Sequence, residues 1–375
     1  MESDRNIRVW VDGCFDMVHF GHANLVRQAK SLGHYLIAGI HSDEEISRHK
    51  GPPVFSQEER YILLKALKWV DEVVKDAPYM TQLEVLEKYD CDFCVHGDDI
   101  SVTEDGVDAY EIVKKAGKYV EVSRTEGIST TDLLYRILRA IKRAKSVELG
   151  VESGVQPNNL PQPETSPLSA YTSGITHYMP NALRLMQFMS PPGGGGADNS
   201  LEGLRAPRPG ETVVYAPGAF DLMHVGHVKF MEKCREIGSY LIVGLHSDES
   251  ALLEAGRIGP ILNMHERLLP LLACRYVNNV ILDAPFVVTE EFLDFFKVDV
   301  VVVGTHTDDL PDSPNDPMAV PRRRGIYRRI ESGSDVTTRQ VIQRIIENQA
   351  YENRNRIKES REVEAVARGG LNCTH

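Results

Sequence analysis

Two histidines near the N-terminus stand in a setting that suits phosphate chemistry. The segment 13–22 reads GCFDMVHFGH, follows an apolar stretch and precedes an amphipathic one. A strand that turns into a helix here would present free backbone N–H groups and a positive dipole end, which attract phosphate. Gly21 would let the backbone approach a ligand closely. His19 and His22 would face the same way, so both imidazoles could stabilise charge that develops on a phosphate oxygen.

The same motif occurs a second time, which argues against two merely structural histidines. Residues 10–46 align without gaps with residues 215–251, and both stretches contain GxFDxxHxGH followed by HSDE. The match continues to the dipeptide Glu59-Arg60, which recurs as Glu266-Arg267. Two copies of this size are too few and too long for a solenoid, so the sequence predicts a duplicated domain.

A later polar motif has the same context. Residues 124–132 read RTEGISTTD, follow a strand-like stretch and open a helical one. The hydroxyls of Ser129 and Thr130 could cap that helix or bind phosphate oxygens, and Arg124 could make a bidentate phosphate contact. A plain helix cap is the alternative interpretation.

The elements that must position these motifs alternate between strand and helix. In the first copy we expect strands at 8–11, 35–40, 71–74, 93–96 and 119–122, and helices at 22–32, 58–68, 81–89, 107–116 and 131–145. Gly33 is expected to end the first helix as its C-cap. Such alternation predicts an α/β fold in which each copy has a parallel sheet flanked by helices. Ligands of such sheets bind outside the carboxyl ends of the strands.

Composition changes divide the chain. We expect a first domain over 1–148, a linker over 149–211, a second domain over 212–350 and a charged tail over 351–375. The linker is rich in Pro and Gly, apart from an apolar segment near 178–189 that we interpret as a short helix or turn docking on a domain.

Charge and composition exclude several classes of protein. The net charge of −12 argues against a nucleic-acid partner, because phosphate contacts need clustered Lys and Arg. No apolar run approaches the length of a membrane span, and the N-terminus lacks a signal-peptide core, so we expect a cytoplasmic protein. Cys91 and Cys94 form a lone CxxC, which we interpret as part of a buried strand rather than a zinc site.

The two motifs together resemble the cytidylyltransferase family, whose members act on glycerol 3-phosphate, phosphocholine or phosphoethanolamine. HxGH alone is shared with adenylyltransferases and class I aminoacyl-tRNA synthetases, whereas RTEGIST beside it is specific. The resemblance covers both copies, and the tandem arrangement is similar to that of the phosphoethanolamine enzymes. It implies two Rossmann-like nucleotidyltransferase domains that transfer CMP from CTP to phosphoethanolamine. Mg²⁺ would accompany CTP, and pyrophosphate would leave in line from the α-phosphorus.

The resemblance also implies roles for individual residues. His19, His22, Lys50 and Arg124 would be catalytic, and Asp16 and Arg60 would lie at the substrate. The nucleotide would contact residues of both motifs and of the Gly97-Asp98 turn, namely Gly13, Cys14, Phe15, Gly21, Gly97, Asp98, Thr125, Gly127, Ile128, Ser129 and Thr130. The alternatives without a role in binding are a surface ion pair for Arg60 and a simple turn at Asp98.

The second copy departs from this pattern. Lys50 aligns with Arg257, and Arg124 aligns with Glu331, which would repel phosphate. We therefore expect the first copy to be the competent site and the second to hold nucleotide weakly, to regulate or to be structural. The second site would comprise Ala216, Pro217, Ala219, Phe220, His224, Gly226, His227, Arg267, Gly304, Ser332, Gly333 and Ser334.

Three alternatives stay open. The same chemistry could act on phosphocholine or glycerol 3-phosphate, the nucleotide could be ATP, or the chain could be a non-catalytic nucleotide-binding regulator. In the family paired domains pack together, so we expect an intramolecular pseudo-dimer, and homodimers could also form.

Overall fold

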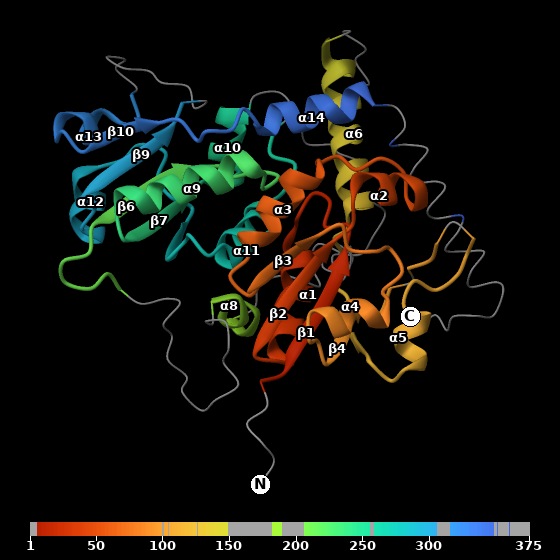
Figure 1. The fold of residues 1–375 in the computed structure, drawn as a ribbon. Helices are drawn as coiled ribbons and strands as arrows, with labels where there is room; N and C mark the ends of the chain where they lie inside the picture. The colour runs from red at the N-terminus through yellow and green to blue at the C-terminus, as the bar shows by residue number, and fades with distance from the viewer. Residues whose placement is uncertain are drawn as a thin grey trace. The chain divides into compact units, whose positions relative to one another are not determined.

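The computed structural model describes residues 6–99, 101–103, 105–125, 127–148, 182–189, 206–255, 259–305, 316–348, 351 and 360 (Figure 1). Within them lie two five-stranded sheets whose paired strands are all parallel. The expected duplicated α/β fold is therefore confirmed. No helix among these residues is long and apolar enough to cross a membrane.

The first sheet has the order β3-β2-β1-β4-β5. Its strands are β1 (Arg8–Gly13), β2 (Tyr35–Ile40), β3 (Glu72–Lys75), β4 (Phe93–Gly97) and β5 (Tyr119–Val122). The helices of this copy are α1 (Phe20–Ser31), α2 (Asp43–His49), α3 (Gln57–Lys65), α4 (Leu83–Lys88), α5 (Glu111–Lys115) and α6 (Thr130–Glu148).

The second sheet repeats this order as β8-β7-β6-β9-β10. Its strands are β6 (Val213–Gly218), β7 (Tyr240–Leu245), β8 (Asn279–Leu282), β9 (Val300–Gly304) and β10 (Tyr327–Ile330). Its helices are α9 (Val225–Ile237), α10 (Asp248–Ala255), α11 (Met264–Ala273), α12 (Glu290–Phe296), α13 (Ala319–Arg323) and α14 (Thr338–Glu347). The short helix expected in the linker is present as α8 (Ala182–Met189), which contacts α11 and buries Phe188 completely.

Each sheet has a switch point beside its central strand. After β1 the chain builds β2 and β3 on one side and then returns to build β4 and β5 on the other. The carboxyl ends of β1 and β4 therefore flank the crevice where such sheets bind ligands. The buried residues Trp10, Ile37 and Cys94 fill one core cluster beneath it, so the ends of the strands are rigidly supported.

Cys91 and Cys94 lie in this core, in agreement with the buried-strand interpretation. Burial raises the pKa of Cys91 to about 12 and raises that of Cys94 well above its ordinary value. Both thiols are therefore protonated near neutral pH and unreactive.

The closing helices do not group with the sheets that precede them in the sequence. Contacts divide the described chain into two compact units. One unit contains the first sheet and the residues from Val341 onward, so most of α14 belongs to it. The other contains the second sheet together with α6 and α8. Each unit is thus completed by the last helix of the other sequence copy.

Candidate active site

The turn between β1 and α1 has an unusual backbone. Phe15 and Met17 have φ angles of 47° and 51°, although neither is glycine. The second copy repeats this geometry at Phe220 and Leu222, both at 49°. Left-handed backbone costs such residues of order 1–3 kcal/mol each and persists only where surrounding contacts enforce it. The turn that ends at the HxGH histidines is therefore held in one shape.

The two histidines of the first copy are oriented by the backbone of α1. His19 is the N-cap, and its Nδ1 accepts a hydrogen bond from Gly21 N at 3.1 Å. His22 Nδ1 accepts from His19 N at 3.4 Å, and the two rings stack with centroids 3.9 Å apart. Because Nδ1 accepts in both rings, the proton of each neutral imidazole is on Nε2. Both side chains are thus set as Nε2–H donors at a helix N-terminus.

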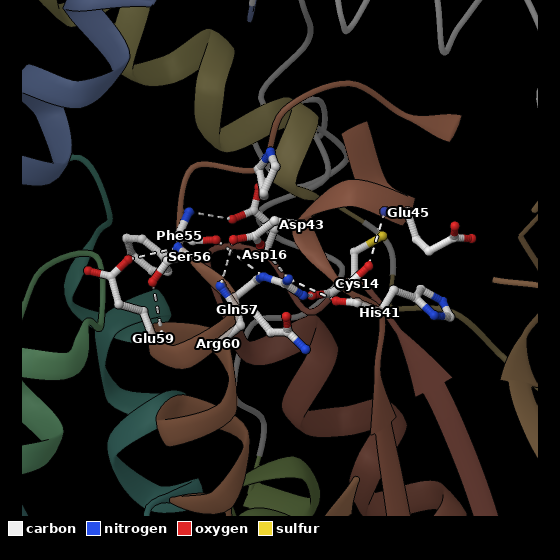
Figure 2. A network of polar contacts seen from close by, with 12 residues as sticks. Cys14, Asp16, His41, Asp43, Glu45, Phe55, Ser56, Gln57, Glu59 and Arg60 are labelled. Atoms are coloured by element: carbon white, nitrogen blue, oxygen red, sulfur yellow. Dashed lines mark hydrogen bonds and ion pairs between the residues drawn. The ribbon is translucent and has the colours of Figure 1, made fainter. Parts of the chain in front are cut away.

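The Arg60 side chain links several loops of this unit through hydrogen bonds (Figure 2). Its side chain is completely buried and donates from Nε to Phe55 O at 3.2 Å and from Nη1 to Cys14 O at 2.6 Å. Its Nη2 donates to His41 O at 2.8 Å and to Asp43 Oδ1 at 2.7 Å. The surface ion pair considered for Arg60 is wrong, because a surface side chain would not bond three backbone carbonyls. Substrate contact by Arg60 stays a prediction, whereas its positioning of the loops is evident.

Asp16 holds the loop that follows α2. Its Oδ1 accepts from Val54 N at 3.1 Å and from Phe55 N at 3.0 Å. Lys50, the C-cap of α2, begins this loop, and its ammonium lies 5.6 Å from the centroid of the Tyr79 ring. The Asp16 carboxylate therefore fixes the far end of a loop whose near end carries the predicted phosphate-binding lysine.

The ends of β4 and β5 bring another group of predicted residues together. Asp98 Oδ1 accepts from Arg124 N at 2.8 Å, and Asp98 N donates to Val122 O at 3.0 Å. Arg124 Nη1 also lies 3.8 Å from Asp99 Oδ2. A Cβ on Gly97 would lie 2.7 Å from Asp99 Oδ1, so a side chain there would displace the Asp99 carboxylate. Asp98 thus has a definite role in placing the Arg124 backbone.

The rest of the RTEGIST motif divides between the units. Thr125 is buried, and its hydroxyl accepts from Asn24 Nδ2 of α1 at 2.9 Å. Gly127, Ile128 and Ser129 belong to the other unit, where Ser129 Oγ accepts from Asp132 N at 3.0 Å. The helix-cap interpretation of Ser129 is therefore confirmed, and nucleotide binding by 127–130 stays a prediction.

The corresponding turn of the second copy packs against the residues around the start of α14. The His224 and His227 rings again stack, at 3.7 Å, but His224 makes no side-chain cap bond and its Nε2 lies 3.3 Å from Thr338 Oγ1. A Cβ on Gly226 would lie 2.2 Å from the carbonyl oxygen of Val336, so that oxygen presses on the start of α9. Burial lowers the pKa of His227 to about 3. The His227 imidazole is therefore neutral near pH 7.

The pairing of strands corrects one part of the alignment. Val122 pairs with Gly97 in the first sheet, and Ile330 pairs with Gly304 in the second. The second copy therefore has one extra residue before β10, and Ser332, not Glu331, stands in the place of Arg124. The alignment of Arg124 with Glu331 was wrong by one residue, and Arg257 lies outside the described residues. A neutral serine still lacks the phosphate contact that an arginine could make.

Other predicted residues of the second site are supported as in the first copy. Arg267 donates to Leu262 O, Ala219 O, His246 O and Asp248 Oδ1, at 3.1, 2.6, 3.0 and 2.7 Å. Ala216 and Pro217 lie in β6, and Gly304 ends β9. Ser332 Oγ donates to Ser334 O at 2.9 Å, which closes the turn around Gly333.

Sequence reasoning missed the acidic partner of the buried arginine. Asp43 pairs with Arg60 in the first copy, as Asp248 does with Arg267 in the second. A signal was available, because HSDE and Glu-Arg both recur in the repeat and either could supply half of an ion pair. Tyr79, over whose ring Lys50 lies, gave no comparable signal.

Comparison with known proteins gives one consistent family. The model of cytidylyltransferase-like proteins matches residues 10–136 and again residues 215–353. An ethanolamine-phosphate cytidylyltransferase from Mus musculus is 47% identical, over 96% of this chain and 91% of that protein. One from Dictyostelium discoideum is 44% identical over 96% of both chains. A choline-phosphate cytidylyltransferase from Arabidopsis thaliana is 44% identical over only 36% of this chain. The chain therefore belongs to the cytidylyltransferase-like family.

Proposed function

We propose that the chain transfers CMP from CTP to phosphoethanolamine, releasing CDP-ethanolamine and pyrophosphate for phospholipid synthesis. The observation that carries this proposal is the pair of backbone-oriented histidines at the N-terminus of α1. The α1 terminus lies beside the switch point of a parallel sheet, where a nucleotide would meet free N–H groups.

The reaction needs positioning and charge stabilisation rather than a covalent nucleophile. A phosphate oxygen of phosphoethanolamine attacks the α-phosphorus, and the bond to the β-phosphate oxygen breaks as pyrophosphate leaves in line. The Nε2–H groups of His19 and His22 donate to phosphate oxygens on which charge grows, and Lys50 and Arg124 neutralise the phosphates. The held shape of the turn means that little reorganisation accompanies the step.

Mg²⁺ is proposed to arrive with the triphosphate. Among the described residues no cluster of three or more His, Cys, Asp or Glu could form a metal cage. Mg²⁺ commonly binds through substrate phosphates, water and one or two carboxylates, and Asp99 at the end of β4 offers one half-exposed carboxylate. The ion would supply charge neutralisation at the phosphates.

We propose phosphoethanolamine as the substrate in place of phosphocholine because the two groups of relatives match very different shares of this chain. The relatives that carry the ethanolamine-phosphate name match nearly the whole of this chain, including the second copy. The choline-phosphate relative matches little more than a third of it. We also propose that the two copies form an intramolecular pseudo-dimer, that the chain can form a homodimer, that the second copy binds nucleotide weakly and that the protein is cytoplasmic.

Pyrophosphate release from purified protein tests the proposal. CTP and Mg²⁺ are supplied with phosphoethanolamine, phosphocholine or glycerol 3-phosphate, and ATP replaces CTP in a control. We expect turnover with CTP and phosphoethanolamine alone. Preference for another alcohol phosphate would correct the substrate, and binding of CTP without turnover would favour a nucleotide-binding regulator.

A further inference from the structure

Helix α14 contacts the first copy through a shared carboxylate. Glu59 forms the capping box of α3, in which its Oε2 accepts from Ser56 N at 2.8 Å (Figure 2). The same carboxylate accepts from both terminal nitrogens of Arg344 in α14, at 2.8 Å each. The side chain of Glu59 is 13% exposed and that of Arg344 is 37% exposed, so the carboxylate end of this bidentate pair is shielded from water. The start of α3 is thus held from within its own copy and from α14.

A second contact reaches the same loop. The side chain of Tyr351, which follows α14 and is 4% exposed, donates from its hydroxyl to Pro53 O at 3.1 Å. Pro53 directly precedes Val54, whose amide is held by Asp16. We call residues 50–56 the Lys50 segment. Its carboxyl half is therefore fixed on one side by Asp16 and Arg60 and on the other by Tyr351 and the Glu59–Arg344 pair.

The other unit contains an equivalent contact between a closing helix and a capping-box glutamate. Glu266 forms the capping box of α11, and its carboxylate accepts from Arg136 Nη1 of α6 at 2.8 and 3.0 Å. Arg136 and Arg344 stand at the same position of the two closing helices, six residues after Thr130 and Thr338. In each copy, the closing helix of the other copy thus pairs an arginine with the capping-box glutamate. This recurrence indicates that the contact is a shared part of the repeat's structure and not an accident of one loop.

We propose that Arg344 and Tyr351 are positioning residues for the first active site, acting through the Lys50 segment. The second copy would then be required for turnover even if it turns over no substrate, because its closing helix completes the loop that carries Lys50. This inference rests on the proposed function for the role of Lys50 in holding phosphates. It predicts an effect mainly on CTP binding, since the hydrogen bonds of Tyr351 and Arg344 reach Pro53 and Glu59, beside Lys50 in the sequence.

The test compares two double variants of the full chain. Arg344→Gln with Tyr351→Phe removes the ion pair and the hydroxyl that hold the Lys50 segment. Arg324→Gln with Tyr276→Phe is the matched control. It removes an arginine paired with Glu290 and Asp294 and a hydroxyl bonded to Glu232, all in the second copy. KM for CTP, kcat, and hydrogen exchange of a peptide covering residues 50–56 are measured for each.

We expect the first variant to raise KM for CTP about 5- to 30-fold, the size expected for one or two lost hydrogen bonds, with kcat within about threefold. Exchange in the 50–56 peptide should accelerate, and the control should match the wild type in both. Unchanged KM and unchanged exchange in the first variant, or equal effects in the control, would overturn the proposal. If the first variant does not fold, Tyr351→Phe alone gives the same readouts. If the wild type does not use CTP, the proposed function fails, and the exchange measurement alone still decides the positioning.

Discussion

Replacing the buried arginines by lysine separates structural support from catalysis, because the two copies give these arginines the same contacts. Arg60 makes four hydrogen bonds with no exposed surface. In Arg60→Lys the ammonium keeps the charge beside Asp43 but lacks the planar fork, so about two of the buried carbonyls lose their donor. At about 1–3 kcal/mol each, the expected loss of stability is about 3 kcal/mol. For a unit of this size that corresponds to a fall in Tm of about 6–12 °C.

Arg267→Lys should lower Tm by a similar amount, because its four partners are equivalent. The effects on activity should differ. Arg60 anchors Cys14 beside the predicted phosphate site, so its loss should lower kcat/KM for CTP about 100-fold, as small misplacements do. Arg267→Lys should stay within about threefold. Calorimetry and pyrophosphate release, run well below both Tm values, measure the two quantities. A shift of Tm under about 2 °C in both variants would refute the buried-network reasoning. Equal loss of turnover would refute the division of labour between the copies.

Two further predictions follow from the paired sites. His22→Ala should lower kcat about 10²–10³-fold, as the loss of one donor to a developing oxyanion does, whereas His227→Ala should change it less than about threefold; comparable losses in steady-state kinetics would contradict the assignment of the first copy as catalytic. Burial raises the pKa of Asp221 to about 6, above an unfolded value of about 3.9, so the stability that this carboxyl contributes is complete below pH 4 and is lost as pH rises through about 6. The wild type should lose about 3 kcal/mol of unfolding free energy from this group between about pH 4 and pH 7, and urea titrations of Asp221→Asn should lack that slope.

Much of the fold could be predicted because its central strands are buried on both faces. The range expected for β2 agrees with the observed one, since short apolar runs between turns mark such strands. The range expected for the edge strand β5 also agrees, although β5 is only partly buried. Helix α2 was missed because only Ile46 of its seven residues is buried, so it has no apolar stripe. Leu32, not Gly33, is the C-cap of α1, and Gly33 is glycine because a Cβ there would lie 2.5 Å from Val9 Cγ2.

The site was predictable where it depends on local sequence. The HxGH turn forms at the end of a strand in both copies, as the repeat indicated. The burial of Arg60 could not be predicted, because Glu-Arg in an amphipathic helix is typical of a solvated face. The grouping of α14 with the first sheet was equally hidden, since the pair of Arg344 with Glu59 joins residues 285 positions apart. No local pattern reports a contact over that distance.

The exchange of closing helices has a consequence for the order of folding during synthesis. Domains usually fold as units from the N-terminus while the ribosome is still translating. Here the hydroxyl that bonds Pro53 arrives 298 residues later, with Tyr351. The first sheet can pair its strands early, but its Lys50 segment must wait until the 298 residues from Pro53 to Tyr351 have been made. A nascent chain of this protein would therefore reach a structured intermediate well before it acquires the contacts that complete its first site.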